Sequence, residues 1–408
     1  MERGALSFLF ESCLGVPAGS LPSTAGEAFA RILDGTGNNA MPKTPVTADA
    51  MTAALASVRE PLLQKWFWPE AAPFAVFLSH DVDEVRWSWR RRLFMGIRHP
   101  RTLAGGNTRY WNFDQALSME RRFSVPSSWY FVADGEHRRD PPYALRDVAP
   151  MMRELAKKGA EVGVHGSFLS YNDGVRLARE RAAVAEVLGR PIPGLRQHFL
   201  NFEPNVTWRL QEEAGFAYDT SFGLNDTSGF RAGMCHPFRP PGREILELPL
   251  IVMDGQLFWH ERLALSQAIE ACERLAGEVA ARGGLLTLNW HQHTYDALSF
   301  PGWWDVYAHL LPWLAERTSL FLTGEQVWRW WTAREAVSVV PARGRSGKLA
   351  WEVRSPVDIQ GLSLRVLGVP GATLAADASH RTETRGADTF LILSDLRGGD
   401  PVTLTVVA

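Results

Sequence analysis

The chain has 408 residues, of which 46% are hydrophobic and 22% are charged, and its formal net charge at pH 7 is -2. This length suits two or three domains, and the balanced charge argues against nucleic acid as a partner because it provides no overall positive field. No run approaches 18 continuous apolar residues, so we expect no membrane span. The three cysteines are far apart and form no Cys-x-x-Cys pair. This usage is typical of a reducing compartment and predicts a cytoplasmic protein.

The chain reads as three successive regions. Residues 1–70 are rich in alanine and helical in pattern, which predicts a helical N-terminal extension. From residue 71 to residue 336, strand-like runs alternate with amphipathic helical segments across short connections. We expect strands at residues 74–81, 127–134, 161–166, 193–200, 244–254 and 285–293. This alternation predicts an α/β fold with a parallel sheet or a (β/α) barrel.

The composition changes after residue 336. Residues 337–408 contain short runs of alternating apolar and polar residues, separated by Gly, Pro and Asp, and no helix-length segment. This pattern predicts a small antiparallel β module at the C-terminus. A sugar-binding module and a structural cap on the barrel both fit it. The 16 tryptophans of the chain suit a large core and also a protein that stacks on sugar faces.

Ionisable residues lie where the predicted strands end. The first strand ends in Asp81 and Asp83, and the later ones end in His165, in Arg196 and His198, in Asp254, and in His291 and His293. In a β/α barrel the carboxyl ends of the strands converge on one face, which carries the active site. Five strand ends of this kind therefore predict a single site with complementary residue types.

The residue types at these ends suggest metal-assisted acid–base chemistry. Asp81 and Asp83 face the same side of an extended chain, and a divalent cation relieves their repulsion if one carboxylate binds it while the other serves as a base. His165 is a plausible metal ligand. Arg196 can hold a base carboxylate in its charged form. Either His291 or His293 can be a general acid. Asp254 can orient the imidazole of that histidine or pair with Arg196.

The order of these motifs resembles that of the polysaccharide deacetylases, carbohydrate esterase family 4, also called the NodB homology domain. The motifs that carry the resemblance are HDVD (80–83), VHGSFLS (164–170), RQHFLNF (196–202), LPLIVMD (248–254) and LNWHQH (288–293). The likeness extends over about residues 72–332. It implies a distorted, TIM-like (β/α) barrel.

The resemblance also implies roles for the individual residues. Asp81 would be the base that activates the attacking water, and Arg196 would position it. Asp83 and His165 would bind zinc or a similar divalent cation. His291 would be the acid that protonates the leaving group, oriented by Asp254. The reaction would be the hydrolysis of an N- or O-acetyl group on a saccharide, as a step of carbohydrate metabolism or glycan biosynthesis.

The second motif departs from the family pattern. Four residues after His165, where the family usually has a second His, this chain has Leu169, which cannot bind a metal. We expect His198 to supply the third ligand, because it follows Arg196 with the same parity at a neighbouring strand end. Two rival hypotheses remain: a decayed barrel that binds glycans without cleaving them, and a metal hydrolase that acts on amides other than those of sugars.

Overall fold

The structure is a computed structural model that describes residue 49 and residues 62–103, 108–318, 320–343, 348–367, 373–386 and 388–407. Most of the predicted N-terminal extension lies outside these residues. Its described part contains strand β1 (Leu62–Lys65) and the start of a short 3-10 helix, η1 (Pro69–Ala71). Residues 62–65 of the extension are therefore a strand, where the sequence pattern predicted a helix, whereas Asp49 is helical.

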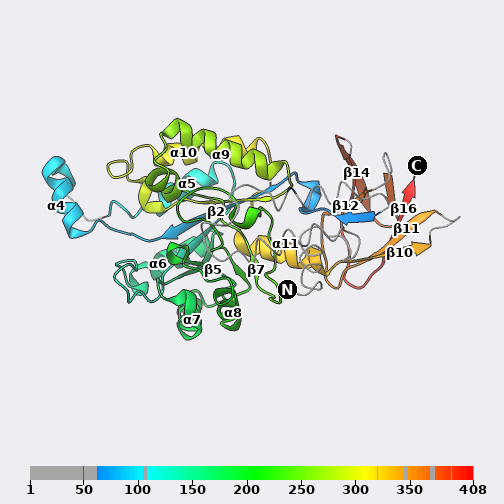
Figure 1. Cartoon of the computed structure of the whole chain (residues 1–408), viewed down its shortest axis with the longest axis horizontal. Coiled ribbons are helices and arrows are strands. Elements are labelled where there is room, and N and C mark those ends of the chain that lie inside the picture. Colours follow the sequence, from blue (N-terminus) through cyan, green and yellow to red (C-terminus); the bar gives the residue numbers. More distant parts are fainter. Residues whose placement is uncertain are drawn as a thin grey trace.

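The centre of the molecule is an eight-stranded sheet in the order β7-β6-β5-β4-β3-β2-β9-β8, and every neighbouring pair is parallel. The strands are β2 (Ala75–Val82), β3 (Ser127–Phe131), β4 (Glu161–Gly166), β5 (Gly194–Gln197), β6 (Tyr218–Asp219), β7 (Leu246–Glu247), β8 (Val252–Met253) and β9 (Leu285–Asn289). The helices are α4 (Trp89–Arg98), α5 (Phe113–Arg121), α6 (Leu145–Lys157), α7 (Gly174–Leu188), α8 (Thr207–Glu213), α9 (Leu265–Ala280), α10 (Trp303–Ala315) and α11 (Gly324–Ala336). Helices flank the sheet, whereas α4 projects away from it (Figure 1), and the predicted distorted barrel is confirmed.

The barrel is distorted where one predicted strand divides into two. Residues 244–254 were expected to form a single strand, but they form β7 and β8, which lie at opposite edges of the sheet. Leu248 donates its N–H to Asp219 O at 2.8 Å on one edge, and Ile251 donates to Thr287 O at 3.4 Å on the other. Pro249 lies between these two residues and has no N–H to continue a ladder. The short crossing segment therefore spans the gap between the two edges.

The barrel core comes from strands that are buried on both faces. All eight residues of β2 are buried, which is why the run reads as continuously apolar until its last residues. Helix α9 contributes Cys272, Leu275 and Val279, at the spacing that places side chains on one helix face. Among the described residues, Cys235 and Cys272 are free thiols and both are buried.

The C-terminal module is built from two four-stranded antiparallel sheets with the orders β1-β12-β15-β14 and β10-β11-β16-β13. Its further strands are β10 (Ser338–Arg343), β11 (Leu349–Arg354), β12 (Leu362–Leu367), β13 (Thr373–Ala376), β14 (His380–Arg385), β15 (Asp388–Leu393) and β16 (Val402–Val407). The predicted antiparallel β module is confirmed. Two of its strands were not anticipated: β14, which is almost entirely polar, and β1, which comes from the other end of the chain.

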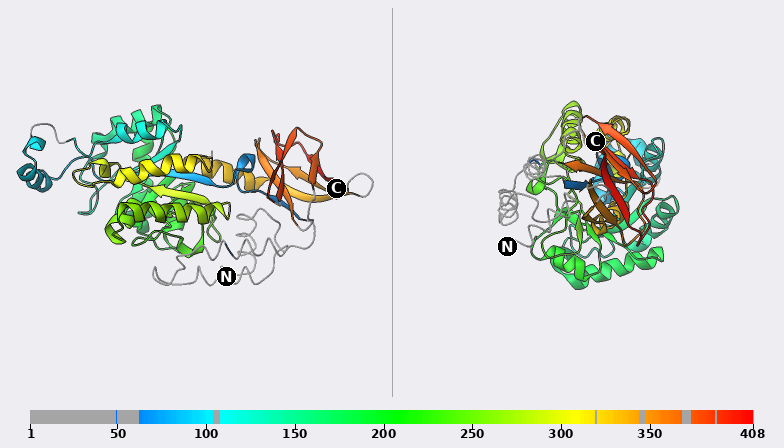
Figure 2. Two further views of the ribbon diagram at one scale, coloured as in Figure 1. Left: turned by 90° about the horizontal axis from the view of Figure 1, so that it is seen from above. Right: turned by 90° about the vertical axis from the view of Figure 1, so that its right-hand side faces the viewer.

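Helix α11 connects the barrel to this module, which lies at the opposite end of the molecule from α4 (Figures 1 and 2). The guanidinium of Arg334, near the end of α11, donates to Trp66 O at 2.7 Å and to Lys65 O at 2.9 Å. Lys65 Nζ donates in turn to Val337 O at 2.6 Å. Strand β1 is thus tied to the exit of α11. No helix in the described part of the chain has the length and apolar character needed to cross a membrane.

Candidate active site

All seven predicted site residues lie at the carboxyl edge of the barrel sheet. Asp81 is in β2 and Asp83 follows it, His165 is in β4, Arg196 is in β5, His198 opens the 3-10 helix η4 (His198–Leu200), Asp254 follows β8, and His291 lies just beyond β9. Parallel strands bring their carboxyl ends to one edge, so residues more than 200 positions apart become neighbours.

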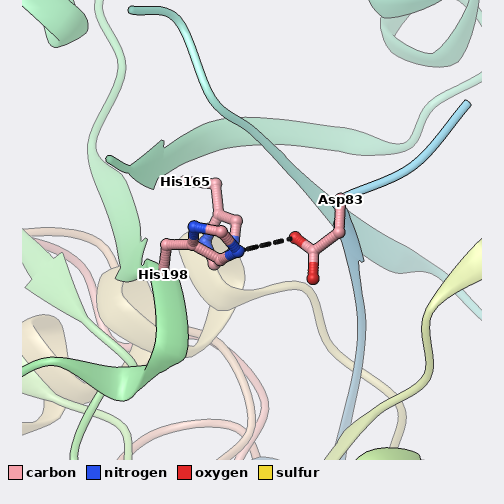
Figure 3. Close-up of side chains that lie close together, drawn as sticks. All are labelled: Asp83, His165 and His198. Atoms are coloured by element: carbon pink, nitrogen blue, oxygen red, sulfur yellow. Dashed lines mark ion pairs between the residues drawn. The ribbon is translucent and has the colours of Figure 1, made fainter. Parts of the chain in front are cut away.

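Three of these side chains converge on one point. The ligand atoms of Asp83, His165 and His198 all lie within 4.8 Å of one another, and Figure 3 shows both imidazole rings beside the Asp83 carboxylate. His165 Nε2 lies 3.3 Å from Asp83 Oδ1. The other ring nitrogen of His165, Nδ1, lies 2.8 Å from the carbonyl oxygen of Arg196. Since a carbonyl only accepts, Nδ1 donates its proton to Arg196, and Nε2 is the ring nitrogen that faces Asp83.

His198 completes the group from a neighbouring strand end. Its Nε2 lies 3.6 Å from Asp83 Oδ1, and its Nδ1 lies 3.6 Å from Asp140 Oδ1. Burial disfavours the charged ring, but Asp83 and Asp140 outweigh it and raise the pKa of His198 to about 9. The ring therefore carries a proton at neutral pH in the metal-free protein, at the place where a bound cation would supply the positive charge instead.

The backbone turns sharply directly after His198. Phe199 and Leu200 have φ values of 58° and 49°, in the left-handed region that non-glycine residues rarely adopt. Strain of this kind clusters at functional sites. Leu169, at the position where the family has a second His, is 43% exposed and has no ligand atom. The histidine brought beside Asp83 and His165 is thus His198.

Asp81 lies next to this group but is held by other partners. Its Oδ1 accepts from Arg196 Nη1 at 3.0 Å, and its Oδ2 accepts from Asn289 Nδ2 at 2.8 Å. Burial raises the pKa of Asp81, but Arg196, followed by His165 and His291, outweighs it, so that the pKa is lower than that of an ordinary aspartate. Asp81 is consequently a carboxylate at neutral pH.

The guanidinium of Arg196 is fixed on several sides. Besides Asp81, Nη1 donates to Ser79 Oγ at 2.9 Å, and Nε donates to Thr220 O at 3.1 Å. The side chain is fully buried, and its charge lies 5.0 Å from the centre of the Tyr130 ring. A buried cation needs such partners, and together they hold it against Asp81.

His291 and Asp254 form the opposite side of the site. His291 Nδ1 lies 2.6 Å from Asp254 Oδ1, and the other oxygen of Asp254 accepts from the backbone N–H of His291 at 2.9 Å. Burial lowers the pKa of His291, but Asp254 and then Asp83 outweigh it and raise the pKa well above its ordinary value. His291 Nε2 points into the site, 3.3 Å from Asp83 Oδ2. Asp254 was expected to contact either the imidazole of the general acid or Arg196, and the structure shows the contact with the imidazole of His291.

The second histidine of this segment is placed differently. The ring of His293 lies 5.4 Å from that of Tyr110 and 5.3 Å from that of Phe300. Burial lowers its pKa to about 4, so it is neutral at pH 7. His293 therefore packs among aromatic rings and has no proton to donate as an imidazolium.

Sequence reasoning missed two residues that contact the site. Asn289 holds Asp81, and its position two residues before His291 in the fifth motif was a usable signal. Asp140 faces His198 and accepts from the backbone N–H groups of Phe168 at 2.7 Å and His137 at 2.8 Å. No local pattern distinguishes Asp140 in its loop. A carboxylate behind a ligand histidine orients the ring and raises its basicity.

Comparison with known proteins finds similarity only at the level of structure. No family model matches the chain, and no curated protein sequence matches it. A solved structure described as a polysaccharide deacetylase from Mycobacterium smegmatis matches with a TM-score of 0.47 and 18% identity, over 66% of this chain and 94% of that one. The structure of Puue allantoinase matches with a TM-score of 0.47 and 15% identity, over 65% of this chain and 92% of that one.

A structure described as a polysaccharide deacetylase from Pseudomonas aeruginosa PAO1 also matches, with a TM-score of 0.47 and 16% identity, over 64% of this chain and 92% of that one. Structures described as polysaccharide deacetylases are thus among the matches. Likeness at these values carries no conclusion about activity, which depends on the site itself.

Proposed function

We propose that this protein is a metal-dependent hydrolase that removes acetyl groups from a carbohydrate. The observation that carries the proposal is the division of labour between two aspartates. Asp83 faces the two histidines that can share a cation with it, whereas Asp81 is held by Arg196 and Asn289 as a charged carboxylate beside them. Hydrolysis of an unactivated acyl group needs both an electrophile and a free base.

The three convergent residues fit a divalent cation. Asp83 Oδ1 is buried without a hydrogen-bond partner among the described residues, and His165 Nε2 lies 3.3 Å from it. One carboxylate and two imidazoles are a set that zinc binds well in catalytic sites, with positions left for water and substrate. Held by these residues, the cation would supply Lewis acidity that polarises the acyl carbonyl and stabilises negative charge on its oxygen.

Asp81 is the proposed base. Its carboxylate takes a proton from a water molecule as that water forms a C–O bond to the acyl carbon. The pairing with Arg196 favours the charged form, so the base is available at neutral pH. Asn289 and Arg196 also fix the orientation of the carboxylate, which keeps the proton acceptor in place.

His291 is the proposed acid. Its raised pKa leaves it protonated at neutral pH, and Asp254 fixes the ring so that Nε2–H points into the site. Nε2 donates its proton to the leaving nitrogen or oxygen as the bond to the acyl carbon breaks. The products are acetate and a free amine or hydroxyl on the saccharide. We further propose that the protein acts in the cytoplasm, a location with which the free thiols Cys235 and Cys272 are compatible.

The first test is metal content, because it does not depend on knowing the substrate. Purified protein should retain a divalent cation, and His165→Ala should lose it. His309→Ala is the matched control, since His309 lies on the surface of α10 and pairs with Glu273 at 2.9 Å. Equal metal content in the two variants would contradict the assignment of His165 as a ligand.

The second test separates the hydrolase from its rivals. Metal-loaded protein should release acetate from at least one acetylated saccharide in a panel of N- and O-acetylated sugars. Release of no acetate, together with glycan binding that Asp81→Asn leaves intact, would favour the non-catalytic binder. Turnover confined to amides that carry no sugar would favour the third hypothesis.

A further inference from the structure

Helix α4 leaves its outer face exposed. The helix follows β2 and projects away from the barrel, at the end of the molecule opposite the β module (Figures 1 and 2). Trp89, Leu93, Phe94 and Ile97 are 71%, 58%, 53% and 75% exposed, respectively. Single exposed apolar residues are ordinary, but a contiguous group on one projecting helix marks an interaction surface.

The inner face of the same helix is seated on the barrel. Met95 and Gly96 are buried, and Met95 belongs to an apolar cluster with Trp87, Tyr110, Phe300 and Trp303. The charge of Arg91 lies 5.3 Å from the centre of the Phe300 ring. The helix therefore has two apolar sides. One side packs against the barrel, and the other is exposed.

The surroundings of this outer face are strongly basic. Between Glu84 and Asp114 the sequence contains seven arginines and no Asp or Glu, although the whole chain has a net charge of -2. The arginines are at positions 86, 90, 91, 92, 98, 101 and 109. Arg90 and Arg98 are exposed on α4 itself. The segment thus combines large apolar side chains with the exposed charges of Arg90 and Arg98, whereas Arg86 and Arg109 pair with Asp147 and Asp296.

We propose that α4 binds the surface of an anionic membrane. Exposed Trp, Phe, Leu and Ile together with arginines on one helix are the composition of helices that lie in the headgroup region, where the rings enter the acyl boundary and the cations meet phosphate groups. The 10 residues of α4 extend over about 15 Å, half of the thickness of a bilayer core, so the helix lies on the membrane and does not span it. A second copy of the chain fits less well, because two such basic faces repel each other.

The proposal also orients the active site. Helix α4 follows β2, whose carboxyl end carries Asp81 and Asp83. Ring contacts connect the apolar cluster beneath α4 to the active site. The ring centre of Tyr110 lies 5.4 Å from that of His293, and the ring centre of His293 lies 5.4 Å from that of His291. A membrane held by α4 would therefore lie on the side of the molecule to which the barrel opens.

Sedimentation with vesicles tests the proposal on the full chain, without any substrate. We expect the protein to sediment with vesicles of phosphatidylcholine and phosphatidylglycerol, and more weakly with phosphatidylcholine alone or at high salt. Leu93→Ser/Ile97→Ser should lower the affinity about 10-fold or more, since two apolar side chains no longer leave water. Val175→Ser is the matched control, because Val175 is 82% exposed on α7 and should change nothing.

A charge-reversal pair separates electrostatic from apolar contributions. Arg90→Glu/Arg98→Glu should abolish the preference for anionic vesicles, whereas Arg146→Glu, whose side chain is 88% exposed on α6, should retain it. Unchanged melting temperatures would establish that all variants fold. The proposal is overturned if the wild-type protein does not sediment with anionic vesicles, or if the α4 variants and their controls sediment equally. It is also overturned if α4 instead mediates a dimer in solution that the serine variant dissolves.

Discussion

The barrel and the C-terminal β module place their charged side chains in opposite ways. At the carboxyl edge of the barrel, Asp81, Arg196 and Asp254 are almost completely buried. Among the described residues from 338 onward, the buried polar side chains are those of two serines, Ser355 and Ser363. The ion pairs of the module, such as Arg397–Asp358 at 3.3 Å, lie on its surface.

This difference indicates where the molecule carries out chemistry. Burying a charge costs free energy unless partners compensate it, and the described residues of the module from 338 onward bury no charged side chain. The barrel accepts this cost at its carboxyl edge, and also at other buried carboxyl groups such as those of Glu161 and Glu180. The comparison therefore predicts that substitutions at the barrel edge alter catalysis, whereas substitutions in the module alter stability alone.

The largest effect should come from removing the module. Deletion of residues 338–408 takes away β12, which pairs with β1 from Leu62↔Leu367 to Lys65↔Leu364. It also exposes Leu63, which is 1% exposed in the intact chain. We expect this deletion to abolish the soluble monomer, as measured by size-exclusion chromatography.

A second truncation is the control for the first. Deletion of residues 1–66 together with residues 338–408 removes β1 as well and leaves no unpaired strand from the module. This variant should remain more soluble than the single deletion. If both truncated proteins are equally soluble, the pairing of β1 with the module contributes little to folding, and the predicted boundaries at residues 70 and 336 would then be supported.

Asp81→Asn should have the next largest effect. Asn keeps the shape of the side chain but cannot accept the proton, so kcat should fall about 100-fold or more, while metal content stays unchanged. Asp358→Asn in the β module is the control and should leave kcat at the wild-type value. A fall of similar size in both variants would contradict the division between the two regions.

Asn289→Ala should have a smaller effect on the same reaction. It removes one of the two donors to Asp81 and leaves Arg196 in place, so kcat should fall about 10-fold, as expected for one hydrogen bond to a charged group. Ser363→Ala is the matched control in the β module. It removes one buried hydrogen bond, which the Ser363 hydroxyl accepts from Ala71 N at 2.7 Å. It should lower the melting temperature without lowering kcat.

The smallest effect concerns pH and the buried carboxyl group of Glu180 on α7, whose pKa burial raises from 4.5 to about 7. The folded protein binds this proton more tightly than the unfolded chain, so the stabilisation is complete below pH 4.5 and is lost as the pH rises toward 7. Glu180→Gln cannot ionise, and above pH 7 its free energy of unfolding should exceed that of the wild type by about 1–3 kcal/mol.

Denaturation by urea at pH 4 and at pH 8 measures this difference. The two proteins should be similar at the lower pH and should diverge at the higher one. Asp400→Asn on the exposed surface of the β module should show no divergence between the two conditions. A constant difference between Glu180→Gln and the wild type at both pH values would show that Glu180 does not titrate in this range.

The sequence by itself determined the barrel class, the antiparallel module and the strand ends at which Asp81, His165, Arg196 and His291 lie. These features are local: period-two and helical patterns, and ionisable residues at the ends of apolar runs, are readable within a few residues. The same parity argument led from Arg196 to His198, which the structure brings beside Asp83 and His165 despite Leu169 at the usual ligand position.

Only the tertiary structure decided the features that depend on contacts between distant residues. The run 244–254 is apolar enough for one strand, but its two ends pair with opposite edges of the sheet, which no local pattern records. Strand β1 joins a module that begins more than 270 residues later, and Asp140 approaches His198 from a loop without any signature. In each case the position of the segment depends on the distant residues that it contacts and not on its own sequence, because pairing and burial are properties of the folded chain.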